Sequence, residues 1–440
     1  MKEAIVPRSR SLSAGWLSPI PSSWPVVRLK YLARLFAGGT PNRGNREYWD
    51  DGTIPWLNSG EVNQWVITTP SEYITEEGLR NSSAKWIPKG ALVMALAGQG
   101  KTKGMVAELA INSTSNQSMA AIVPNEPRIA RFLLYWLNAN YETIRSRAGG
   151  EQRDGLNLEI IGDIPCPNPA LKVQCAIANY LDKETLQIDA LISAKERLLE
   201  LLADKRQALI TTTVTRGLNP HVTLRDSEVF WLGRIPQHWR IAGFTKYLVG
   251  FVDYRGRTPE KTRSGAFLLT ARNIKNGYID YENSEEFVDP ADLDEIMRRG
   301  IPSLGQILFT TEAPLGQAAL VDRVDIAIAQ RVIKLDYDPT VLLNTYALQW
   351  ILSAPFQYQL GTLATGSTAL GIKGERLHLL RNLIPPLDEQ HAIIEYLTRE
   401  TAKIEDLKAT TERSIDLLRE RRAAMIAATV TGKIDVEAAT

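Results

Sequence analysis

The sequence has little that would support disulfide or metal chemistry. Only two cysteines occur in 440 residues, Cys166 and Cys175, so neither a disulfide framework nor a cysteine-rich zinc site can be assembled from them. The histidines stand singly and give no metal-ligand spacing; they are His221, His238, His378 and His391. We therefore expect no metal site in this chain, and the scarcity of cysteine fits a reducing cytoplasm.

Long apolar runs are missing as well. The longest, such as residues 91–98 (ALVMALAG), are far shorter than the roughly 20 residues of a membrane-spanning helix. Residues 1–25 carry Arg, Ser and Pro where a secretory leader needs an unbroken apolar core. The sequence therefore predicts a soluble protein that stays in the cytoplasm.

The formal net charge is only +1, so no global positive field indicates a nucleic-acid partner. A site for a polyanion would have to come from locally clustered Arg and Lys. With 44% apolar residues, a chain of this length has the material for two or three domains.

An internal repeat organises the chain. The segment WLSPIPSSW at 16–24 returns as WLGRIPQHW at 231–239, and residues 169–215 match residues 385–431 without a gap. The regions between these anchors diverge, although an outline survives, as in Trp136 and Trp350. Such a duplication is expected when the two middles bind different things, although neutral drift of a structural duplication is an alternative.

The matched segments predict two long amphipathic helices. No Gly or Pro interrupts residues 174–210, and apolar residues recur at heptad spacing there and in residues 390–425. The predicted coiled-coil positions are Leu181, Ile188, Leu191, Leu198, Leu202, Leu209, Leu397, Ile404, Leu407, Leu418 and Met425. Gly217 and Gly432 follow as stop signals.

Polar heptad positions such as Lys195 and Thr411 favour pairing of the two helices within the molecule over a long filament. A helix over residues 174–210 would be roughly 55 Å long. Two bodies attached to such a pair could span sites about one DNA turn apart, roughly 34 Å. The open alternative is a generic coiled-coil dimerisation element.

The two variable regions mix short strand-like runs, turns and brief helical segments. Residues 91–96 and 105–109 predict a hairpin, and residues 306–310 and 318–321 repeat it. Helical stretches follow near 129–138 and 345–352. The predicted fold is α+β: two α+β domains in pseudo-twofold arrangement, separated by two long helices that form an antiparallel coiled coil. The predicted segments are a first domain at 1–165, a central helix at 166–217, a second domain at 218–383 and a C-terminal helix at 384–440.

Polar and basic side chains gather in the predicted turns, and these are the residue types that read base edges and hold phosphates. In the first domain the candidates for DNA contact are Arg43, Arg46, Asn58, Asn63, Gln99, Lys101, Lys103, Gln152 and Arg153, with Glu61 beside them. In the second they are Arg255, Arg257, Lys261, Arg272, Asn273, Lys275, Gln317, Gln330, Arg331 and Lys373. The hypothesis concerns the set, because any single member could be an ordinary solvated side chain.

Catalytic motifs are not evident. The string AGQGKTKG at 97–104 resembles a phosphate-binding loop but has Ala95 in place of its first glycine, so a Gly-rich hairpin turn is the better interpretation. The acidic string at 388–391 opens a long helix after two prolines, unlike a helicase motif. No Asn-Pro-Pro-aromatic or Asp-Pro-Pro-aromatic segment exists to act on an extruded adenine. We expect no catalytic residues.

Three segments resemble a known family. They are VTRGLNPHVTLRDSEVFWLGRIPQHW at 214–239, IPPLDEQHAIIEYL at 384–397 and VTGKIDV at 430–436, and together they are similar to the specificity subunits of type I restriction-modification systems. The resemblance covers the whole chain. It implies a non-catalytic subunit in which each variable region reads one half of a split DNA site and the helices set the unread spacer.

The resemblance also implies partners. Two modification subunits would dock on the helices, bind S-adenosylmethionine and methylate adenine, and restriction (motor-nuclease) subunits would use ATP and Mg²⁺. No cofactor is expected in this chain itself. Two other functions stay open: a coiled-coil structural adaptor that binds proteins rather than DNA, and a self-contained methyltransferase or nuclease, which the missing motifs disfavour.

Overall fold

The computed structural model describes residue 16 and residues 19–98, 100–147, 155–254, 259–366 and 370–436. The chain divides into two compact units. The first comprises residues 1–194 and 413–440, and the second comprises residues 195–412. Each unit contains one α+β head together with half of each of two long helices, α6 (Leu171–Arg216) and α10 (Leu387–Val430).

The head of the first unit is built on a sheet in the order β2-β9-β6-β7-β4. Its strands are β2 (Ala33–Ala37), β9 (Met119–Pro124), β6 (Leu92–Ala95), β7 (Val106–Leu109) and β4 (Val66–Ile67). A second sheet has the order β5-β3-β8, from β5 (Glu72–Ile74), β3 (Ile54–Leu57) and β8 (Thr114–Ser115). A small ladder joins β1 (Val26–Arg28) to β10 (Pro165–Pro167).

The first head's helices are short. They are α1 (Leu29–Leu32), α2 (Glu76–Arg80), α3 (Ala130–Ala139), α4 (Tyr141–Ser146) and α5 (Leu158–Gly162), with 3₁₀ turns η1 (Arg46–Tyr48), η2 (Glu61–Asn63) and η3 (Pro127–Ile129). Every side chain of β6 is buried, as expected for a central strand covered on both faces. Leu92 and Met94 enter the core that includes α3, while Val93 and Ala95 enter the core on the opposite face.

The head of the second unit repeats this plan with a sheet in the order β14-β22-β19-β20. Its strands are β14 (Leu248–Asp253), β22 (Val332–Tyr337), β19 (Ile307–Thr311) and β20 (Leu315–Leu320). A sheet in the order β18-β15-β21 follows, from β18 (Phe287–Val288), β15 (Ala266–Leu269) and β21 (Ile326–Ile328). Three ladders pair β11 (Leu224–Asp226) with β12 (Arg234–Pro236), β13 (Arg240–Gly243) with β23 (Arg381–Ile384), and β16 (Ile274–Lys275) with β17 (Tyr278–Ile279).

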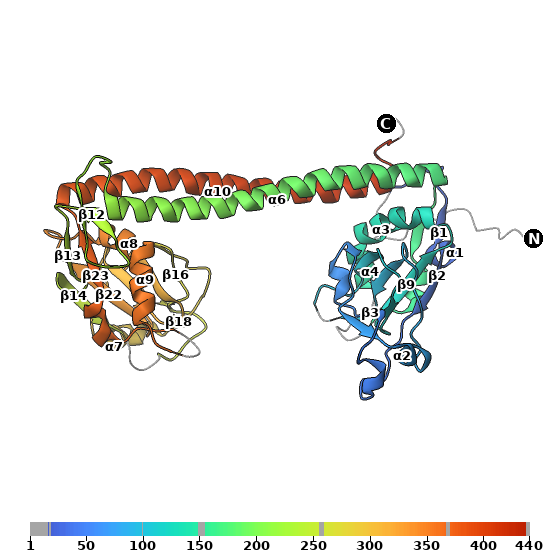
Figure 1. Cartoon of the computed structure of the whole chain (residues 1–440), viewed down its shortest axis with the longest axis horizontal. Helices are drawn as coiled ribbons and strands as arrows, with labels where there is room; N and C mark the ends of the chain where they lie inside the picture. Colours follow the sequence, from blue (N-terminus) through green and yellow to red (C-terminus); the bar gives the residue numbers. More distant parts are fainter. Residues whose placement is uncertain are drawn as a thin grey trace, which may run out of the picture. The chain divides into compact units, whose positions relative to one another are not determined.

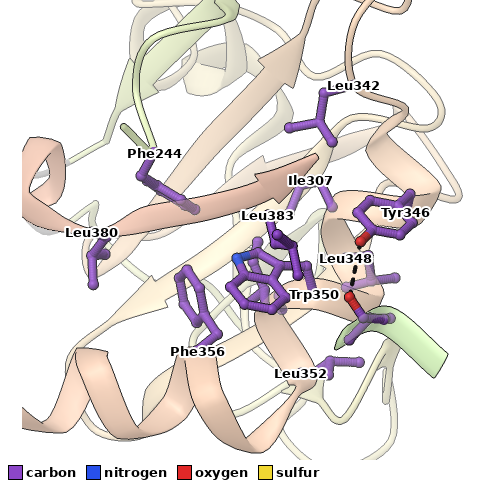
Figure 2. Close-up of a cluster of buried hydrophobic side chains, with 14 of the residues drawn as sticks. Phe244, Ile307, Leu342, Tyr346, Leu348, Trp350, Leu352, Phe356, Leu380 and Leu383 are labelled. Carbon is purple, nitrogen blue, oxygen red and sulfur yellow. Dashed lines mark hydrogen bonds between the residues drawn. The ribbon is translucent and has the colours of Figure 1, made fainter. Parts of the chain in front are cut away.

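The second head's helices are α7 (Leu293–Ile296), α8 (Asn344–Leu352) and α9 (Ala354–Leu363), with 3₁₀ turns η4 (Pro290–Asp292) and η5 (Gly374–Leu379). Figure 2 shows its principal core, in which Trp350 and Phe356 lie beside one another. Tyr346 is fully buried there and donates a hydrogen bond to the backbone carbonyl of Val214 on α6, 3.1 Å away, the dashed line in Figure 2. The head is therefore joined to the helix by a shared core.

The predicted α+β fold with two long helices is confirmed, as are both predicted hairpins, which are β6–β7 and β19–β20. The Gly-rich segment at 97–104 connects β6 to β7, as a hairpin turn does. The helices predicted near 129–138 and 345–352 are α3 and α8. The boundaries of the four predicted segments stay a prediction. The two compact units do not correspond to those segments, because each long helix is divided between the two units.

Within each unit, the segments of the two long helices lie side by side and run antiparallel (Figure 1). Asp189 of α6 pairs with Arg422 of α10, and further along α6 Arg206 pairs with Glu405, which comes earlier in α10. Both helices continue through a unit boundary without interruption. Each ends before a glycine with positive φ, Gly217 (φ 73°) and Gly432 (φ 71°), which confirms the predicted stop signals.

The apolar seam between the helices follows the predicted heptads in part. Five predicted positions are buried: Leu181, Ile188, Leu202, Leu397 and Ile404. Four are half-buried: Leu198, Leu209, Leu418 and Met425. Leu191 and Leu407, however, are 52% and 46% exposed. The seam follows alternating steps of four and three residues from Leu181 in α6 and from Leu397 in α10, so Leu191 and Leu407 fall beside it. Thr185 and Ile415 occupy seam positions and are buried.

Candidate nucleic-acid interface

Two loops occupy the same place in the two heads. Residues 58–65, which include η2, follow β3, and residues 270–277, which include the short strand β16, follow β15. Each preceding strand has an antiparallel neighbour on one side and a parallel neighbour on the other, β8 for β3 and β21 for β15. The duplication has therefore placed one loop in each head by the same topology, and predicted DNA contacts fall on both.

Loop 58–65 is held by a nearly buried carboxylate. Glu61 is 8% exposed and accepts hydrogen bonds from the backbone N of Asn58 (3.0 Å) and from the hydroxyl of Ser71 (2.6 Å). Asn58 also donates its side-chain amide to Ser71 (2.8 Å) and accepts from the backbone N of Gly60 (2.8 Å). Asn63 is exposed at the end of η2 and is the predicted contact that the loop presents to solvent.

Loop 270–277 has a buried amide at the matching position. Asn273 is fully buried and accepts from the backbone N of Thr270 (2.9 Å), as Glu61 does from Asn58. Its amide donates to the carbonyls of Asp280 (2.9 Å) and Ser284 (3.0 Å). A side chain without exposed surface cannot reach a base edge, so Asn273 is a structural residue of its loop and leaves the set of candidate contacts.

The remaining contacts predicted around this loop are accessible to different degrees. Arg272 is exposed. Lys275 is half-buried and forms an ion pair with Asp280 at 2.8 Å, and this lysine lowers the pKa of the Asp280 carboxyl below its ordinary value. Gln317 accepts a hydrogen bond from the backbone N of Asn276 at 2.8 Å, so its carbonyl oxygen is already used within the head.

A concave surface in the second head brings several predicted contacts together. A cleft of about 220 Å³ is lined by Lys261, Arg272, Gln330 and Arg331. Lys261 pairs with Glu286 at 2.7 Å, and Arg331 pairs with Glu312 at 3.5 Å. The side chains of Lys261 and Arg331 are about half exposed, 51% and 48%. Such partly exposed pairs are weak, and a polyanion can compete with the carboxylates for these cations.

Lys373 is the last described candidate of the second head. Its side chain is 70% exposed, and its ammonium lies 4.0 Å from the carboxylate of Glu375. It does not line the cleft at Lys261 and Arg331. The lysine can therefore hold a phosphate from solvent, but nothing orients it toward a particular base.

The first head distributes its basic candidates differently. The Arg43 guanidinium lies 3.8 Å from the centre of the Trp49 ring and 4.8 Å from that of Trp56, and it forms an ion pair with Glu72. This arrangement fixes its direction while leaving 53% of the side chain exposed. Arg46 is exposed on η1.

The candidates after β6 differ in accessibility. Lys101 is exposed in the hairpin turn, whereas Lys103 is buried with 8% exposure and is poorly placed for contact with a large ligand. Five further predicted contacts lie outside the described residues: Gln99, Gln152, Arg153, Arg255 and Arg257. The site residues as a set stay a prediction.

An ion-pair cluster joins the first head to α6. Arg131 donates to Asp182 (2.9 Å) and to Glu108 (2.5 Å), and the hydroxyl of Tyr135 donates to Asp182 (2.7 Å). Burial raises the pKa of Tyr135 well above its ordinary value. The phenol is therefore a hydrogen-bond donor to the helix at neutral pH.

Two arginines were missed by the sequence analysis because they lie on the helices rather than in the turns. Arg206 and Arg422 hold the same position in the duplicated segment. Each side chain is about three-quarters buried, with 23% and 27% exposure. The signal that could have found them is a cation at a seam position, repeated in both helices, where an apolar residue is expected.

Other kinds of site are not found in the part of the chain that the structure describes. Within it, no group of three or more His, Cys, Asp or Glu side chains could hold a metal ion. No helix among these residues is long and apolar enough to cross a membrane.

Comparison with known proteins shows which family the chain resembles. Residues 21–201 match the family model described as the type I restriction modification DNA specificity domain. The specificity subunit of the Escherichia coli type I restriction enzyme EcoR124I/EcoR124II is 24% identical over 202 residues, which are 45% of this chain and 44% of that protein. The EcoKI specificity subunit of E. coli strain K12 is 20% identical over 87% of this chain and 82% of that protein.

The MjaIX specificity subunit of Methanocaldococcus jannaschii is 26% identical. The matched region is less than half of each relative's length: 44% of the EcoR124I/EcoR124II subunit and 42% of the MjaIX subunit. Among solved structures, a chain from a study of assembly and conformational transition of the type I R-M system superposes with a TM-score of 0.71 at 15% identity, over 95% of this chain and all of that one. The HsdS subunit of Thermoanaerobacter tengcongensis superposes with a TM-score of 0.53 at 15% identity, over 95% of this chain and 99% of that one. The resemblance to type I specificity subunits is thereby confirmed, and residues 21–201 are the part of the chain that matches the model of their DNA specificity domain.

Proposed function

We propose that this chain is the non-catalytic specificity subunit of a type I restriction-modification complex and reads a bipartite, asymmetric DNA site. Each head takes one half-site. The observation that carries the proposal is the pair of loops at 58–65 and 270–277, which follow equivalent strands but present different side chains. A duplicated framework with unlike surfaces is suited to two unlike half-sites, because base edges are distinguished by the hydrogen-bonding groups that meet them.

The long helices set the unread spacer between the half-sites. Each of them is continuous through a unit boundary, and a helix resists bending far better than a linker of irregular structure. The heads are joined to these helices by buried contacts such as Tyr346 with Val214 and Tyr135 with Thr185. The spacing between the half-sites is then a property of the helices, and the sequences read are a property of the heads.

The chemistry resides in partner subunits. Two modification subunits dock on this chain, bind S-adenosylmethionine and methylate adenine, and restriction subunits supply ATP- and Mg²⁺-dependent translocation and cleavage in the cytoplasm. Support comes from the names of the relatives, which are specificity subunits of type I restriction enzymes. This chain would supply recognition alone.

The proposal is tested by duplex selection. The full chain, purified with the modification subunit encoded beside it, is incubated with a library of randomised DNA duplexes, and the bound fraction is sequenced. We expect two unlike sequence blocks separated by a gap of fixed length and free composition. A bound fraction with the composition of the starting library would contradict DNA recognition and favour a protein-binding adaptor.

The second head offers a matched pair of variants. Arg331→Gln removes a cation that lines the cleft, whereas Arg298→Gln removes an exposed cation on α7's C-terminal side that pairs with Glu295. Loss of one phosphate contact reduces the salt dependence of binding by about one unit of slope. We expect this reduction for the first variant only.

A further inference from the structure

Arg206 and Arg422 make equivalent three-way contacts in the two units. Arg206 comes four residues after Leu202 in α6, and Arg422 comes four residues after Leu418 in α10. Both therefore occupy seam positions, and each meets a carboxylate on the other long helix. Burying most of a guanidinium in a helix seam is unfavourable unless its donors have partners, so the partners of each arginine identify its role.

In the first unit, Arg422 joins both helices to the head. Its Nε and Nη2 donate to the two carboxylate oxygens of Asp189 on α6, at 2.8 and 3.2 Å. Its guanidinium carbon lies 5.8 Å from the centre of the Trp65 ring. Trp65 is the last residue of loop 58–65 and comes two residues after the exposed Asn63.

Trp65 is itself fixed within the head. Its ring lies 5.2 Å from that of Tyr135, measured between centres, and Tyr135 donates to Asp182 on α6. The backbone carbonyl of Trp65 accepts from Glu108 on β7 at 3.1 Å. Loop 58–65 is therefore tied to the helix pair at its C-terminal end by one aromatic ring and one guanidinium.

In the second unit, Arg206 makes the corresponding contacts. Its Nε lies 3.3 Å from a carboxylate oxygen of Glu405 on α10, an ion pair in which Nε makes no hydrogen bond. Its Nη2 donates to the backbone carbonyl of Asn276 at 3.2 Å. Asn276 lies in loop 270–277, directly after Lys275, and its backbone N donates to Gln317. The same loop of the other head is thus tied to the helix pair by the repeat-related arginine.

We infer that Arg206 and Arg422 are positioning residues for DNA recognition, each fixing the reading loop of its own head against the paired helices. The inference rests on the proposed function. A guanidinium is a rigid fork that can bind a carboxylate and a ring or carbonyl together. Groups that read bases must be held to within about 0.5 Å of their productive places. Without the arginine, the loop keeps its own hydrogen bonds but loses its fixed place relative to the helices.

The two variants should act on different halves of the target. Arg422→Gln frees loop 58–65 and should relax discrimination at the half-site read by the first head, whereas Arg206→Gln should relax the other half-site. Both should also reduce the preference for the native spacer over spacers longer or shorter by one base pair. From the typical strength of partly exposed ion pairs, we expect a loss of preference of about two- to fivefold.

The measurement uses the full chain with its modification subunit and the duplex obtained by selection, together with duplexes carrying altered spacers or one substituted half-site. Arg419→Gln and Arg197→Gln are the controls, because these exposed arginines pair within their own helices with Asp416 and Glu200. Unchanged spacer and half-site preferences in Arg422→Gln and Arg206→Gln would overturn the inference. So would equal losses in the control variants.

An exchange of charges separates a positioning role from a merely structural one. The double variant Asp189→Arg with Arg422→Asp restores an ion pair between the helices but removes the guanidinium from the Trp65 ring. We expect the midpoint of thermal unfolding to recover while the spacer preference stays relaxed. Recovery of both would show that Arg422 only links the helices.

Hydrogen exchange on the full chain without DNA distinguishes failure of the inference from failure of the proposed function. We expect faster exchange in loop 58–65 of Arg422→Gln and in loop 270–277 of Arg206→Gln, with no change in the control variants. Unchanged loops would overturn the inference. If hydrogen exchange in the loops changes as expected but the wild-type protein selects no duplex, DNA recognition would instead be contradicted.

Discussion

Gln390 repeats Gln174: each is buried at the start of a long helix and donates its side-chain amide to the carbonyl of the proline five residues earlier, Pro385 at 2.9 Å and Pro169 at 2.8 Å. The bond holds the segment before the helix against the first helical turn. Prolines lack a backbone N–H and cannot donate a hydrogen bond there themselves. The duplication has thus preserved a buried polar contact, and with it the direction in which each head's chain enters its helix.

Removing Gln390 should be the more damaging of the two changes. Its carboxamide also accepts from the backbone N of Leu343 (2.9 Å) and donates to the carbonyl of Val341 (2.9 Å). Gln390→Ala leaves these buried groups unpaired, so we expect a loss of about 2–3 kcal/mol, against about 1 kcal/mol for Gln174→Ala. Chemical unfolding of the two variants measures the difference. Equal losses would contradict the assigned contacts.

The glycines that end the helices should not tolerate a side chain. A Cβ at Gly432 would lie 2.7 Å from Pro21 and 2.9 Å from the Trp24 ring, and one at Gly217 would lie 3.1 Å from the Trp239 ring. Positive φ adds strain in both cases. We expect Gly432→Ala to lower the stability by about 2 kcal/mol or more and Gly217→Ala by about 1 kcal/mol.

Gly361 in α9 is the matched control for these glycines. A Cβ there meets nothing within 4 Å, so Gly361→Ala should leave the protein unchanged or stabilise it by about 0.5 kcal/mol. Thermal unfolding of the three variants under one set of conditions ranks them. A ranking in which Gly361→Ala is the least stable would be incompatible with this account of the helix ends.

Substitutions of two neighbouring residues in the second head should affect different properties, one DNA binding and the other the stability of the fold. Arg272 is exposed and lines the cleft that also contains Lys261 and Arg331, whereas Asn273 is buried with its hydrogen-bonding groups satisfied. Arg272→Ala should weaken binding of the selected duplex by about tenfold without lowering the unfolding midpoint. Asn273→Ala should lower stability by about 2 kcal/mol, because three backbone groups lose their partner.

Binding titrations below the unfolding temperature, paired with thermal unfolding of the same samples, check both effects. The opposite pattern, with stability lost in Arg272→Ala and binding lost in Asn273→Ala, would reverse the roles given to these side chains. It would also return Asn273 to the set of base contacts.

Lengthening the helices should change the spacer alone. Four residues inserted after Lys195 and four at the matching place after Thr411 add about 6 Å of helix to each partner, close to the rise of two base pairs. We expect the selected duplexes to keep both sequence blocks and to have a longer gap. Altered blocks with an unchanged gap would show that the helices do not set the spacing.

The sequence predicted the helices and the duplicated plan well because these depend on periodic burial, which heptads and repeats record directly. The burial of individual candidate residues could not be predicted from the sequence. Arg272 and Asn273 are adjacent and both polar, yet one faces solvent and the other closes the loop, since the loop's position after β15 decides which side chain turns inward. Arg206 and Arg422 were overlooked because a heptad pattern is drawn from apolar residues, whereas these cations are stabilised by partners distant in sequence.

The central claim is that two unlike heads on one duplicated helical frame read two unlike half-sites. Its most direct test exchanges the second head, residues 240–383, for a repeat of the first head, residues 25–165, followed by duplex selection with the modification subunit. The account predicts a symmetric target, in which the block read by the first head appears twice in inverted orientation across a gap. Selection of the original asymmetric target by the exchanged protein would contradict it. Failure of the unaltered protein to select any target would also contradict it.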